Sequence, residues 1–385
     1  MHEAETGTPG LPFPALRPGA PRAVGVSAPG KLILMGEHAA VYGRPALVAA
    51  VDLRLRVALT PVATGSAETS GIELDLPQLP HREHLSWVAL RDYARTAEES
   101  WQAYSRKPCL AAFQRLRGDD PAHVVKVALG EALAARPGPP PGALLLRIAS
   151  DLPIGSGFGS SAATAVGVVA AFLACCSAPV EPGEIERLAL EVERRQHGSP
   201  SGIDTATVVR GGLLLFRRGA KGVPAVEPLA TGSPLLGSFR VYDTGTPAEP
   251  TGAVVAAVSE RRERDGSRHE QIFERMEAAT LALQGELLRE SADPARVTGL
   301  IRDHEACLEE LGVVPATVRS LIRQVEAAGG AAKISGAGSL SGPGAGSLLV
   351  YHRQPEQIAA WRFLHPFPFH PVHLGAPGFR REELE

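Results

Sequence analysis

A cluster of glycines and serines at residues 151–164 has the clearest chemical implication in the sequence. Its glycines recur at every second position, at Gly155, Gly157 and Gly159. Glycine leaves no side chain to keep an anion away from the backbone. Ser160 and Ser161 then open a run typical of a helix, whose free N–H groups and positive dipole end favour phosphate. Their hydroxyls can also reach a phosphate-bound metal. The segment predicts a loop that binds nucleotide phosphates, with ATP as the expected ligand.

Two other phosphate-binding motifs do not fit this loop. A Walker A loop needs a lysine directly before its Ser or Thr, and Gly159 stands there instead. The dinucleotide fingerprint needs a sixth-position glycine, and counting from Gly155 that position is Ser160. A nicotinamide-dependent oxidoreductase is therefore disfavoured. The remaining alternative to a phosphate cradle is a flexible loop that ends in a helix cap.

Three further segments carry residue types suited to catalysis, at residues 28–43, 193–204 and 333–346. The first places Lys31, Glu37 and His38 around two turn glycines. The second runs from Glu193 at a helix end through a tight turn to Asp204. Phosphoryl transfer to an alcohol needs a group that accepts the hydroxyl proton and cations that neutralise charge, and these residues can supply both.

The same residues also have purely structural interpretations. Asp204 precedes Thr-Ala-Thr and would suit a helix cap. Lys31 would be a surface lysine in a turn, and Glu193 a solvated helix glutamate. His38 would be a buried histidine whose hydrogen bonds are satisfied. On the residues alone, both sets of interpretations stay open.

The hydrophobic pattern places these segments on a mixture of strands and helices. In the first half we expect two strands on either side of a Pro29-Gly30 turn, then a short helix, then two further extended segments. Their ranges are 24–28, 31–35, 46–51 and 53–59. A largely apolar run at 143–148 precedes the glycine loop, and helices are expected at 162–176 and 181–196. Before that apolar run, the proline-rich stretch 137–142 predicts a rigid surface connection.

The second half predicts short strands and long helices. The strands are expected at 211–216, 239–243, 332–335 and 347–351, and the helices at 253–264, 268–291, 294–311 and 315–328. The segment 365–371 is too rich in proline for a central strand. Residues 1–22, rich in proline and glycine, predict a flexible tail. We expect an N-terminal domain at 23–215 and a C-terminal domain at 216–385.

Composition narrows the class of protein. The chain has 385 residues, of which 44% are hydrophobic and 21% charged, as expected for a globular protein with two domains. A net charge of −3 indicates neither nucleic acid nor an anionic membrane as partner. The acidic N-terminus does not fit a signal peptide, and no apolar run is long enough to cross a bilayer. Four cysteines without metal-ligand spacing predict reduced thiols and a cytoplasmic location.

Four motifs occur in a fixed order along the chain. They read Pro-Gly-Lys-x-x-Leu-x-Gly-Glu-His at 29–38, Pro-x-Gly-x-Gly-x-Gly-Ser-Ser-Ala-Ala at 153–163, His-Gly-Ser-Pro-Ser-Gly-Ile-Asp at 197–204 and Lys-x-Ser-Gly-Ala-Gly at 333–338. Together they resemble the GHMP kinase family over nearly the whole globular chain. The details are most similar to mevalonate kinases. Galactokinases carry Asp-Tyr after Gly-Glu-His, phosphomevalonate kinases typically have Gly-Glu-Tyr, and homoserine kinases lack Pro-Gly-Lys.

The resemblance implies an α+β fold of two domains, of which the first is similar to ribosomal protein S5 domain 2, with the active site between them. It implies ATP-dependent phosphorylation of mevalonate to 5-phosphomevalonate, in isoprenoid precursor synthesis. Asp204 would be the base and Lys31 its cationic neighbour, while Glu193 with Ser160 or Ser161 would hold Mg²⁺. Acceptor contacts are expected from Lys31, Glu37, His38, Asp204 and Thr244. Nucleotide contacts are expected from Pro153, Gly155, Ser156, Gly157, Phe158, Gly159, Ser160, Ser161, Ala162, Gly336, Ala337 and Gly338.

One segment departs from the family pattern. Relatives usually follow the last Gly-Ala-Gly with further glycines, whereas this chain inserts Ser339-Leu-Ser341 before Gly342. In the family this loop normally lies near the transferred phosphate, and the sequence does not decide which contacts the altered loop makes here. Two alternatives remain for the function: another small-molecule kinase of the family, acting on phosphomevalonate or a sugar, and a family member that binds without catalysis. Many relatives form homodimers, and nothing in the sequence shows an interface.

Overall fold

The computed structural model of this chain describes residues 21–62, 70–136, 138–153, 155–218, 224–229 and 233–384. The expected flexible tail at 1–22 lies almost wholly outside these residues, as do Pro137 and Ile154. Among the helices described, none combines the length and the apolar character that crossing a membrane requires.

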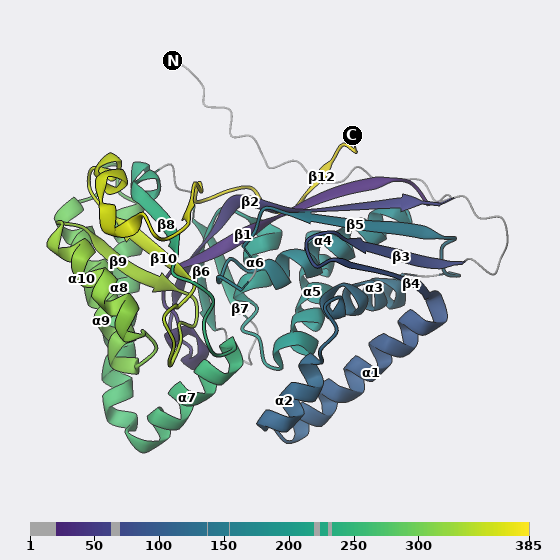
Figure 1. The fold of residues 1–385 in the computed structure, drawn as a ribbon, viewed down its shortest axis with the longest axis horizontal. Coiled ribbons are helices and arrows are strands. Elements are labelled where there is room, and N and C mark those ends of the chain that lie inside the picture. The colour runs from purple at the N-terminus through teal and green to yellow at the C-terminus, as the bar shows by residue number, and fades with distance from the viewer. Residues whose placement is uncertain are drawn as a thin grey trace, which may run out of the picture.

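A large mixed sheet forms the first domain (Figure 1). Its strands run in the order β12-β1-β2-β5-β3-β4, while β6 pairs with β2 and β7 with β6. All pairs are antiparallel except β3 with β5. The strands are β1 (Val24–Met35), β2 (Ala46–Pro61), β3 (Gly71–Leu76), β4 (His81–Ser86), β5 (Leu144–Ser150), β6 (Leu213–Arg218), β7 (Pro224–Leu229) and β12 (Arg380–Glu382).

Helices cover one face of this sheet, below it in Figure 1. They are α1 (Trp87–Arg106), α2 (Leu110–Arg117), α3 (His123–Ala135), α4 (Ser160–Cys175), α5 (Pro182–His197) and α6 (Ile203–Arg210), and the 3₁₀ helix η1 (Ala39–Tyr42) joins β1 to β2. Small and apolar residues make α4 the central helix, almost wholly buried. A Cβ atom at Gly167 would lie 3.0 Å from Val57, so α4 rests directly on β2. The expected order of strand, glycine loop and helix is confirmed as β5, loop and α4.

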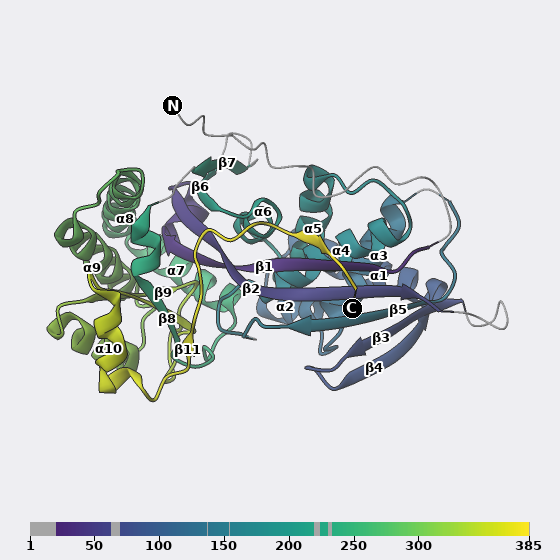
Figure 2. The same ribbon diagram turned by 90° about the horizontal axis from the view of Figure 1, so that it is seen from above.

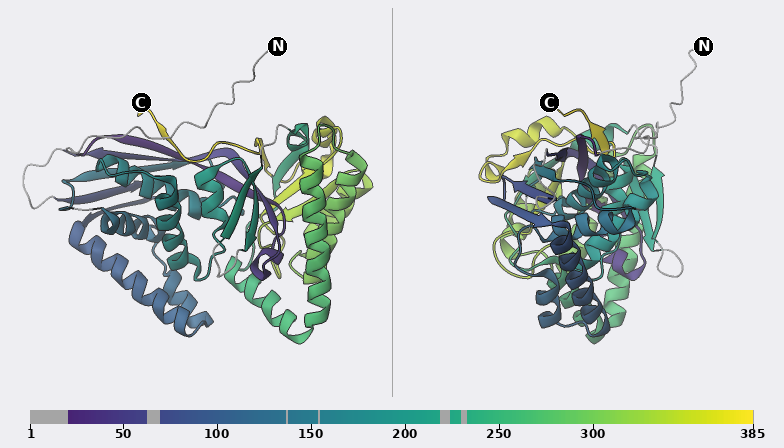
Figure 3. Two further views of the ribbon diagram at one scale, coloured as in Figure 1. Left: turned by 180° about the vertical axis from the view of Figure 1, so that it is seen from behind. Right: turned by 90° about the vertical axis from the view of Figure 1, so that its right-hand side faces the viewer.

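A smaller antiparallel sheet and four long helices form the second domain. The sheet order is β11-β8-β10-β9, and α8, α9 and α10 stand together on its outer side (Figure 3). The strands are β8 (Phe239–Asp243), β9 (Ala331–Ser335), β10 (Ser347–Tyr351) and β11 (Phe369–His370), and the helices are α7 (Thr251–Arg264), α8 (Gly266–Leu287), α9 (Pro294–Leu311) and α10 (Ala316–Ala327). Short 3₁₀ helices are η4 (Pro234–Ser238), η5 (Pro355–Ala360) and η6 (Arg362–Leu364). These elements confirm the expected helices and strands within a few residues; α8 ends at Leu287 rather than 291. The proline-rich segment contributes only the short edge strand β11.

The Pro29-Gly30 turn is a wrong prediction. Both residues lie inside β1, which runs without a break, and β2 is likewise one strand rather than two segments. The register shifts from Pro29 opposite Arg54 to Gly30 opposite Val51, so a bulge absorbs the irregularity. A Cβ atom at Gly30 would lie 2.5 Å from Leu152 and 3.0 Å from Phe158 O. Glycine is needed here because β1 passes directly against the glycine loop.

The C-terminal segment ties the two domains together. It leaves the small sheet at β11, crosses over β2 and ends as β12 beside β1 (Figure 2). On the way, Gly375 N donates to Ala50 O at 2.8 Å, and Arg54 donates to Gly378 O at 2.7 Å. The expected domain boundary after residue 215 falls inside β6, which belongs to the large sheet, as does β12. We therefore propose a boundary between β7 and β8, with the last strand returning to the first domain.

Candidate active site

The glycine loop between β5 and α4 has the geometry of an anion cradle. Gly155, Gly157 and Gly159 have φ angles of 77°, 84° and 74°, which side chains other than glycine rarely adopt. Gly159 is the N-cap of α4 and has no side chain to cap it, so the helix start is left for another acceptor. A Cβ atom at position 159 would lie 2.8 Å from the Lys31 side chain. The cradle suits nucleotide phosphates, with Lys31 at its side.

Lys31 and Asp204 meet beside this loop. Lys31 Nζ lies 3.2 Å from Asp204 Oδ1. The lysine is 5% exposed, whereas the aspartate side chain is 35% exposed. Lys31 is therefore buried, while the carboxylate of Asp204 can be reached from solvent. Asp204 stands in the first turn of α6, after Gly202 in left-handed conformation at the N-cap. The N-cap of α6 is thus Gly202, and no side chain caps this helix end. Asp204 is therefore not the helix cap that its structural interpretation would have made it.

Glu193 lies near this pair with Ser161. Ser161 Oγ donates to Glu193 Oε1 at 2.5 Å, and His197 Nε2 lies 3.6 Å from Glu193 Oε2. The carboxylate is 3% exposed, so it is not a solvated helix residue. Burial raises the pKa of the Glu193 carboxyl, and the negative charge of Asp204 adds to this effect. A hydroxyl and a carboxylate are oxygen ligands of the kind that Mg²⁺ prefers.

The other expected metal ligand, Ser160, makes a different contact: its backbone O accepts from Thr164 Oγ1 at 2.9 Å. In the part of the chain that the structure describes, no three His, Cys, Asp or Glu residues gather in a way that could hold a metal ion. Ser161 and Glu193 would supply two oxygen ligands, so a metal held there would need further ligands, such as phosphate oxygens of a nucleotide.

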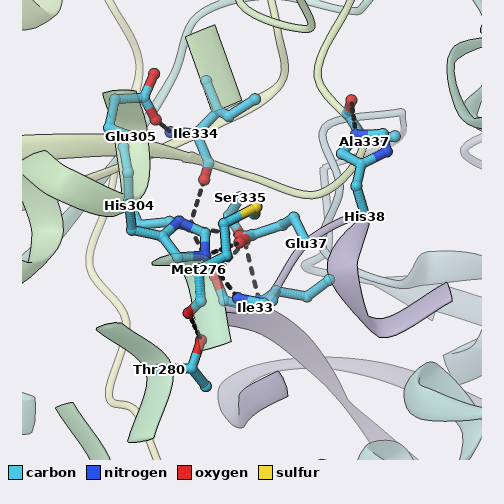
Figure 4. Close-up of polar contacts among 12 residues, drawn as sticks. Ile33, Glu37, His38, Met276, Thr280, His304, Glu305, Ile334, Ser335 and Ala337 are labelled. Carbon is cyan, nitrogen blue, oxygen red and sulfur yellow. Dashed lines mark hydrogen bonds and ion pairs between the residues drawn. The ribbon is translucent and has the colours of Figure 1, made fainter. Parts of the chain in front are cut away.

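Glu37 is buried between the two domains, at the back of the first motif (Figure 4). Its Oε1 accepts a hydrogen bond from Lys333 Nζ, which also donates to Ile334 O at 2.5 Å. On the same side, Gly36 N donates to His304 Nε2 at 2.9 Å. Burial raises the pKa of the Glu37 carboxyl, although Lys333 opposes the rise. The structure thus turns Glu37 toward the fourth motif, at 333–338.

His38 makes a second contact between these motifs. Its Nε2 lies 2.9 Å from Ala337 O, and the residue has a φ of 58°, unusual for a side chain other than glycine. Burial lowers the pKa of the His38 ring, so the neutral form is favoured. A neutral ring that donates from Nε2 to a carbonyl keeps Nδ1 as an acceptor.

Glu305 is a buried carboxyl group near Lys333, and its burial leads to a testable prediction on stability. Its Oε2 accepts from Ile334 N at 3.1 Å, while its buried Oε1 has no hydrogen-bond partner among the described residues. Burial raises the pKa of the Glu305 carboxyl well above its ordinary value of 4.5. The folded state therefore holds this proton more tightly than the unfolded state. The stability that Glu305 contributes is complete below pH 4.5 and is lost as the pH rises through the folded-state pKa.

Glu305→Gln cannot ionise, so the variant is expected to gain stability over the wild type as the pH is raised from about 5 to about 8. Urea unfolding at both pH values measures the difference. Glu310→Gln, on the same helix but paired at 2.6 Å with the half-exposed Arg275, serves as control and should show no such gain. A difference between Glu305→Gln and wild type that stays constant with pH would contradict the prediction.

The glycine loop is docked onto the second domain. Ser156 Oγ donates to Asp243 Oδ2 at 2.5 Å, and Ser347 N donates to Ser156 O at 3.0 Å. Thr244 Oγ1 donates to Gly346 O at 2.8 Å and accepts from Ala345 N at 2.9 Å. Its hydroxyl is therefore engaged with the glycine-rich part of the third catalytic segment, residues 336–346, called the third glycine stretch below. The two glycine-rich segments therefore meet at the end of β8.

The first residues of the third stretch follow β9 directly. Gly338 has a φ of 73°, and a Cβ atom there would lie 2.1 Å from Val313 O. A Cβ atom at Gly157 would lie 3.0 Å from Ser335 O, and one at Gly159 would lie 2.8 Å from Lys31. The fourth and first motifs therefore both border the glycine loop. The structure thus brings together the loop, Lys31, Asp204, Glu193 and the segment that begins at Gly336.

Several residues of this region were not expected from the sequence. Asp243 could have been found, because it ends a predicted strand immediately before Thr244. His304 and Glu305 had no signal, since they sit on an ordinary amphipathic helix. Trp101 Nε1 of α1 donates to Gly198 O at 2.9 Å, which fixes the turn that leads to Asp204. This contact links α1 to the candidate site.

Comparisons with known proteins agree with the motifs. The sequence profile described as "GHMP kinases N terminal domain" matches residues 122–212. The mevalonate kinase of Aeropyrum pernix is 31% identical over 318 residues, which cover 82% of this chain and 86% of that protein. These similarities reach far beyond the motifs themselves.

Solved structures support the same fold. The mevalonate kinase of Methanococcus jannaschii gives a TM-score of 0.66 at 19% identity, covering 92% of this chain and 99% of that one. The galactokinase of Lactococcus lactis, solved with galactose, gives 0.67 at 15% identity, covering 93% and 94%. The expected two-domain α+β fold is thereby confirmed. Because enzymes named for different acceptors share it, the fold does not select an acceptor.

Proposed function

The chain belongs to the GHMP kinase family, and from this premise we propose that it transfers the γ-phosphoryl group of ATP to the primary hydroxyl of mevalonate. The products would be 5-phosphomevalonate and ADP, in a cytoplasmic step of isoprenoid precursor synthesis. The observation that carries the proposal is the Lys31–Asp204 pair, 3.2 Å apart, beside a glycine loop that can hold phosphates.

Asp204 is the proposed base. As the new P–O bond forms, its carboxylate would accept the proton of the acceptor hydroxyl, and its open side chain leaves room for that hydroxyl. Lys31 would hold the carboxylate in place and stabilise the negative charge that develops on the acceptor oxygen. The buried stem of Lys31 fixes the position of the ammonium group, so little reorganisation is needed during the reaction.

Nucleotide binding is proposed for the glycine loop and the start of α4. Ser161 and Glu193 would hold Mg²⁺, which, when bound, neutralises charge on the phosphates. Of the two serines, Ser161 is the better candidate because its hydroxyl already contacts Glu193. The start of the third glycine stretch, from Gly336 to Gly338, would cover the phosphates from the second domain.

Two of the residues expected to contact the acceptor, Glu37 and Thr244, are proposed to act indirectly. Glu37 is bound to Lys333 and Thr244 to the third glycine stretch, so both would shape the acceptor pocket rather than reach into it. His38 donates to Ala337 O, and its Nδ1 would accept a hydrogen bond from an acceptor hydroxyl. The His38 ring would thus bind a hydroxyl group of the acceptor rather than a carboxylate.

An acceptor panel tests the proposal. Mg-ATP-dependent ADP release is measured with mevalonate, 5-phosphomevalonate, galactose, homoserine and no acceptor. Turnover with mevalonate alone is the expected result. Turnover with another acceptor only would replace mevalonate but keep the kinase chemistry. Nucleotide binding without turnover on any acceptor would favour the family member that binds without catalysis.

A further inference from the structure

The inserted segment Ser339-Leu-Ser341 faces the loop that joins β8 to α7, and a single carboxylate in that loop receives it. Ser339 Oγ donates to Glu249 Oε2 at 2.6 Å, and Leu340 N donates to the same oxygen at 2.9 Å. Ser341 Oγ donates to Glu249 Oε1 at 2.5 Å. Three donors from three successive residues thus converge on one side chain. Hydrogen bonds to an ionised acceptor are stronger than neutral ones.

The remaining contacts of the segment fix its ends but not its middle. Ser339 is fully buried, and its N–H donates to Val313 O at 2.9 Å. Beyond the insertion, Thr317 Oγ1 donates to Pro343 O at 2.6 Å, and a Cβ atom at Gly344 would lie 2.6 Å from Gly245 O. Between these anchors, Glu249 holds Leu340 and Ser341, and the Ser339 hydroxyl shares its proton between Glu249 and Ser341 O, which lies 2.8 Å away.

The loop that carries Glu249 also holds the nucleotide loop. At its start, Asp243 accepts from Ser156 Oγ at 2.5 Å and from Gly245 N at 2.7 Å. At its end, Ala248 N donates to Ser339 Oγ at 3.1 Å, next to the Glu249 contacts. One short connection therefore contacts both glycine-rich segments, with a carboxylate at either end.

We propose that Glu249 is a positioning residue that holds the third glycine stretch over the nucleotide phosphates, in place of the additional glycines that would otherwise follow Gly338. The proposal rests on the proposed nucleotide site. Gly336, Ala337 and Gly338 directly precede the inserted segment. If Ser339–Ser341 loses its contacts with Glu249, the residues expected at the phosphates become more mobile. Glu249 itself would not touch the nucleotide, because its oxygens are already engaged by the insertion.

The charge of Glu249 is compatible with a nearby phosphate site. Its partly exposed carboxylate accepts hydrogen bonds from the inserted segment at both oxygens. Burial by itself would raise the pKa of the Glu249 carboxyl, but the hydrogen bonds from Ser339 and Ser341 outweigh it and lower the pKa. The side chain therefore stays ionised at neutral pH and keeps all three bonds.

Direct nucleotide binding by the full chain tests the inference. Calorimetric titration with Mg-ADP should show about tenfold weaker binding for Glu249→Ala and about threefold weaker binding for Ser341→Ala, which removes one donor. The double variant should bind no more weakly than Glu249→Ala, because both changes remove the same contact. Ser341→Thr keeps a hydroxyl and should restore wild-type binding. Glu263→Ala, at an exposed glutamate of α7, is the matched control and should bind as the wild type does.

Kinetics then separate positioning from general damage. In an active enzyme, the KM for ATP should rise about tenfold in Glu249→Ala while the KM for the acceptor changes less than about twofold. ADP binding equal to wild type in both Glu249→Ala and Ser341→Ala would overturn the inference, whatever the acceptor proves to be. Failure of mevalonate as acceptor would overturn the proposed function without affecting the ADP comparison. If Glu249→Ala does not fold, the surface variant Ser341→Ala and its threonine rescue decide the outcome.

Discussion

Asp204→Asn is expected to lower kcat by about 10²–10⁴-fold, the range typical of losing a general base. The substitution keeps the size and shape of the side chain but removes the group that would accept the hydroxyl proton. It also leaves Lys31 without the carboxylate 3.2 Å away, so the ammonium group loses its orientation toward the acceptor. Nucleotide affinity should stay within about twofold, because the glycine loop and Glu193 are unchanged.

Steady-state kinetics and Mg-ADP titration of the same preparations measure these effects. Asp151→Asn is the matched control, since Asp151 opens the glycine-loop segment and pairs at 2.7 Å with the half-exposed Arg56. Its kcat should equal that of the wild type, because exposed ion pairs contribute little. An Asp204→Asn variant with more than a tenth of wild-type kcat would show that Asp204 is not the base.

Lys333→Met should lower the free energy of unfolding by about 3–5 kcal/mol, the usual result of removing one partner of a buried ion pair. Lys333 and Glu37 are almost fully buried, and Lys333 also donates to backbone carbonyls of both domains, Ile334 O and, at 3.4 Å, Ile33 O. Without the ammonium group, Glu37 would keep a buried carboxylate with no cation beside it. Urea unfolding at neutral pH measures the loss.

The double variant Lys333→Met/Glu37→Gln separates pairing from packing. Removing both charges should recover part of the lost stability, so the double variant should be more stable than the sum of the single effects predicts. Strict additivity of the two losses would contradict the view that Glu37 and Lys333 act as a pair. Lys126→Met provides a comparison, since Lys126 pairs with Glu83 and Asp120 within the first domain alone.

The motif-bearing segments were largely predictable because their local sequence carries the information. Glycines that require positive φ, a helix after Ser160, and a helix that leads to a tight turn all follow from short-range rules. The two-domain α+β fold and the proximity of Lys31, Asp204 and Glu193 were instead expected from the resemblance to the family. The roles of these residues remain predictions until they are measured.

Long-range pairings could not be read from the sequence. Glu37 and Lys333 are 296 positions apart, and no local pattern says which cation a buried glutamate will meet. The continuous strand β1 was missed because Pro29-Gly30 has the local chemistry of a turn, and only its pairing with β2 reveals a bulge. Strand β4 has few residues of high β-propensity and exists because it pairs with β3. Likewise, β12 returns to the first sheet because it pairs with β1, and the residues of β12 alone do not predict this pairing.

The most direct test of the proposed function is ³¹P NMR of the purified chain with Mg-ATP and mevalonate. The expected result is a new phosphomonoester signal, coupled to the methylene protons next to the primary hydroxyl of mevalonate, that grows in step with ADP. The same mixture with Asp204→Asn should show almost none of it. Release of inorganic phosphate alone, or no change in ATP from a folded protein that binds Mg-ADP, would contradict phosphoryl transfer to mevalonate.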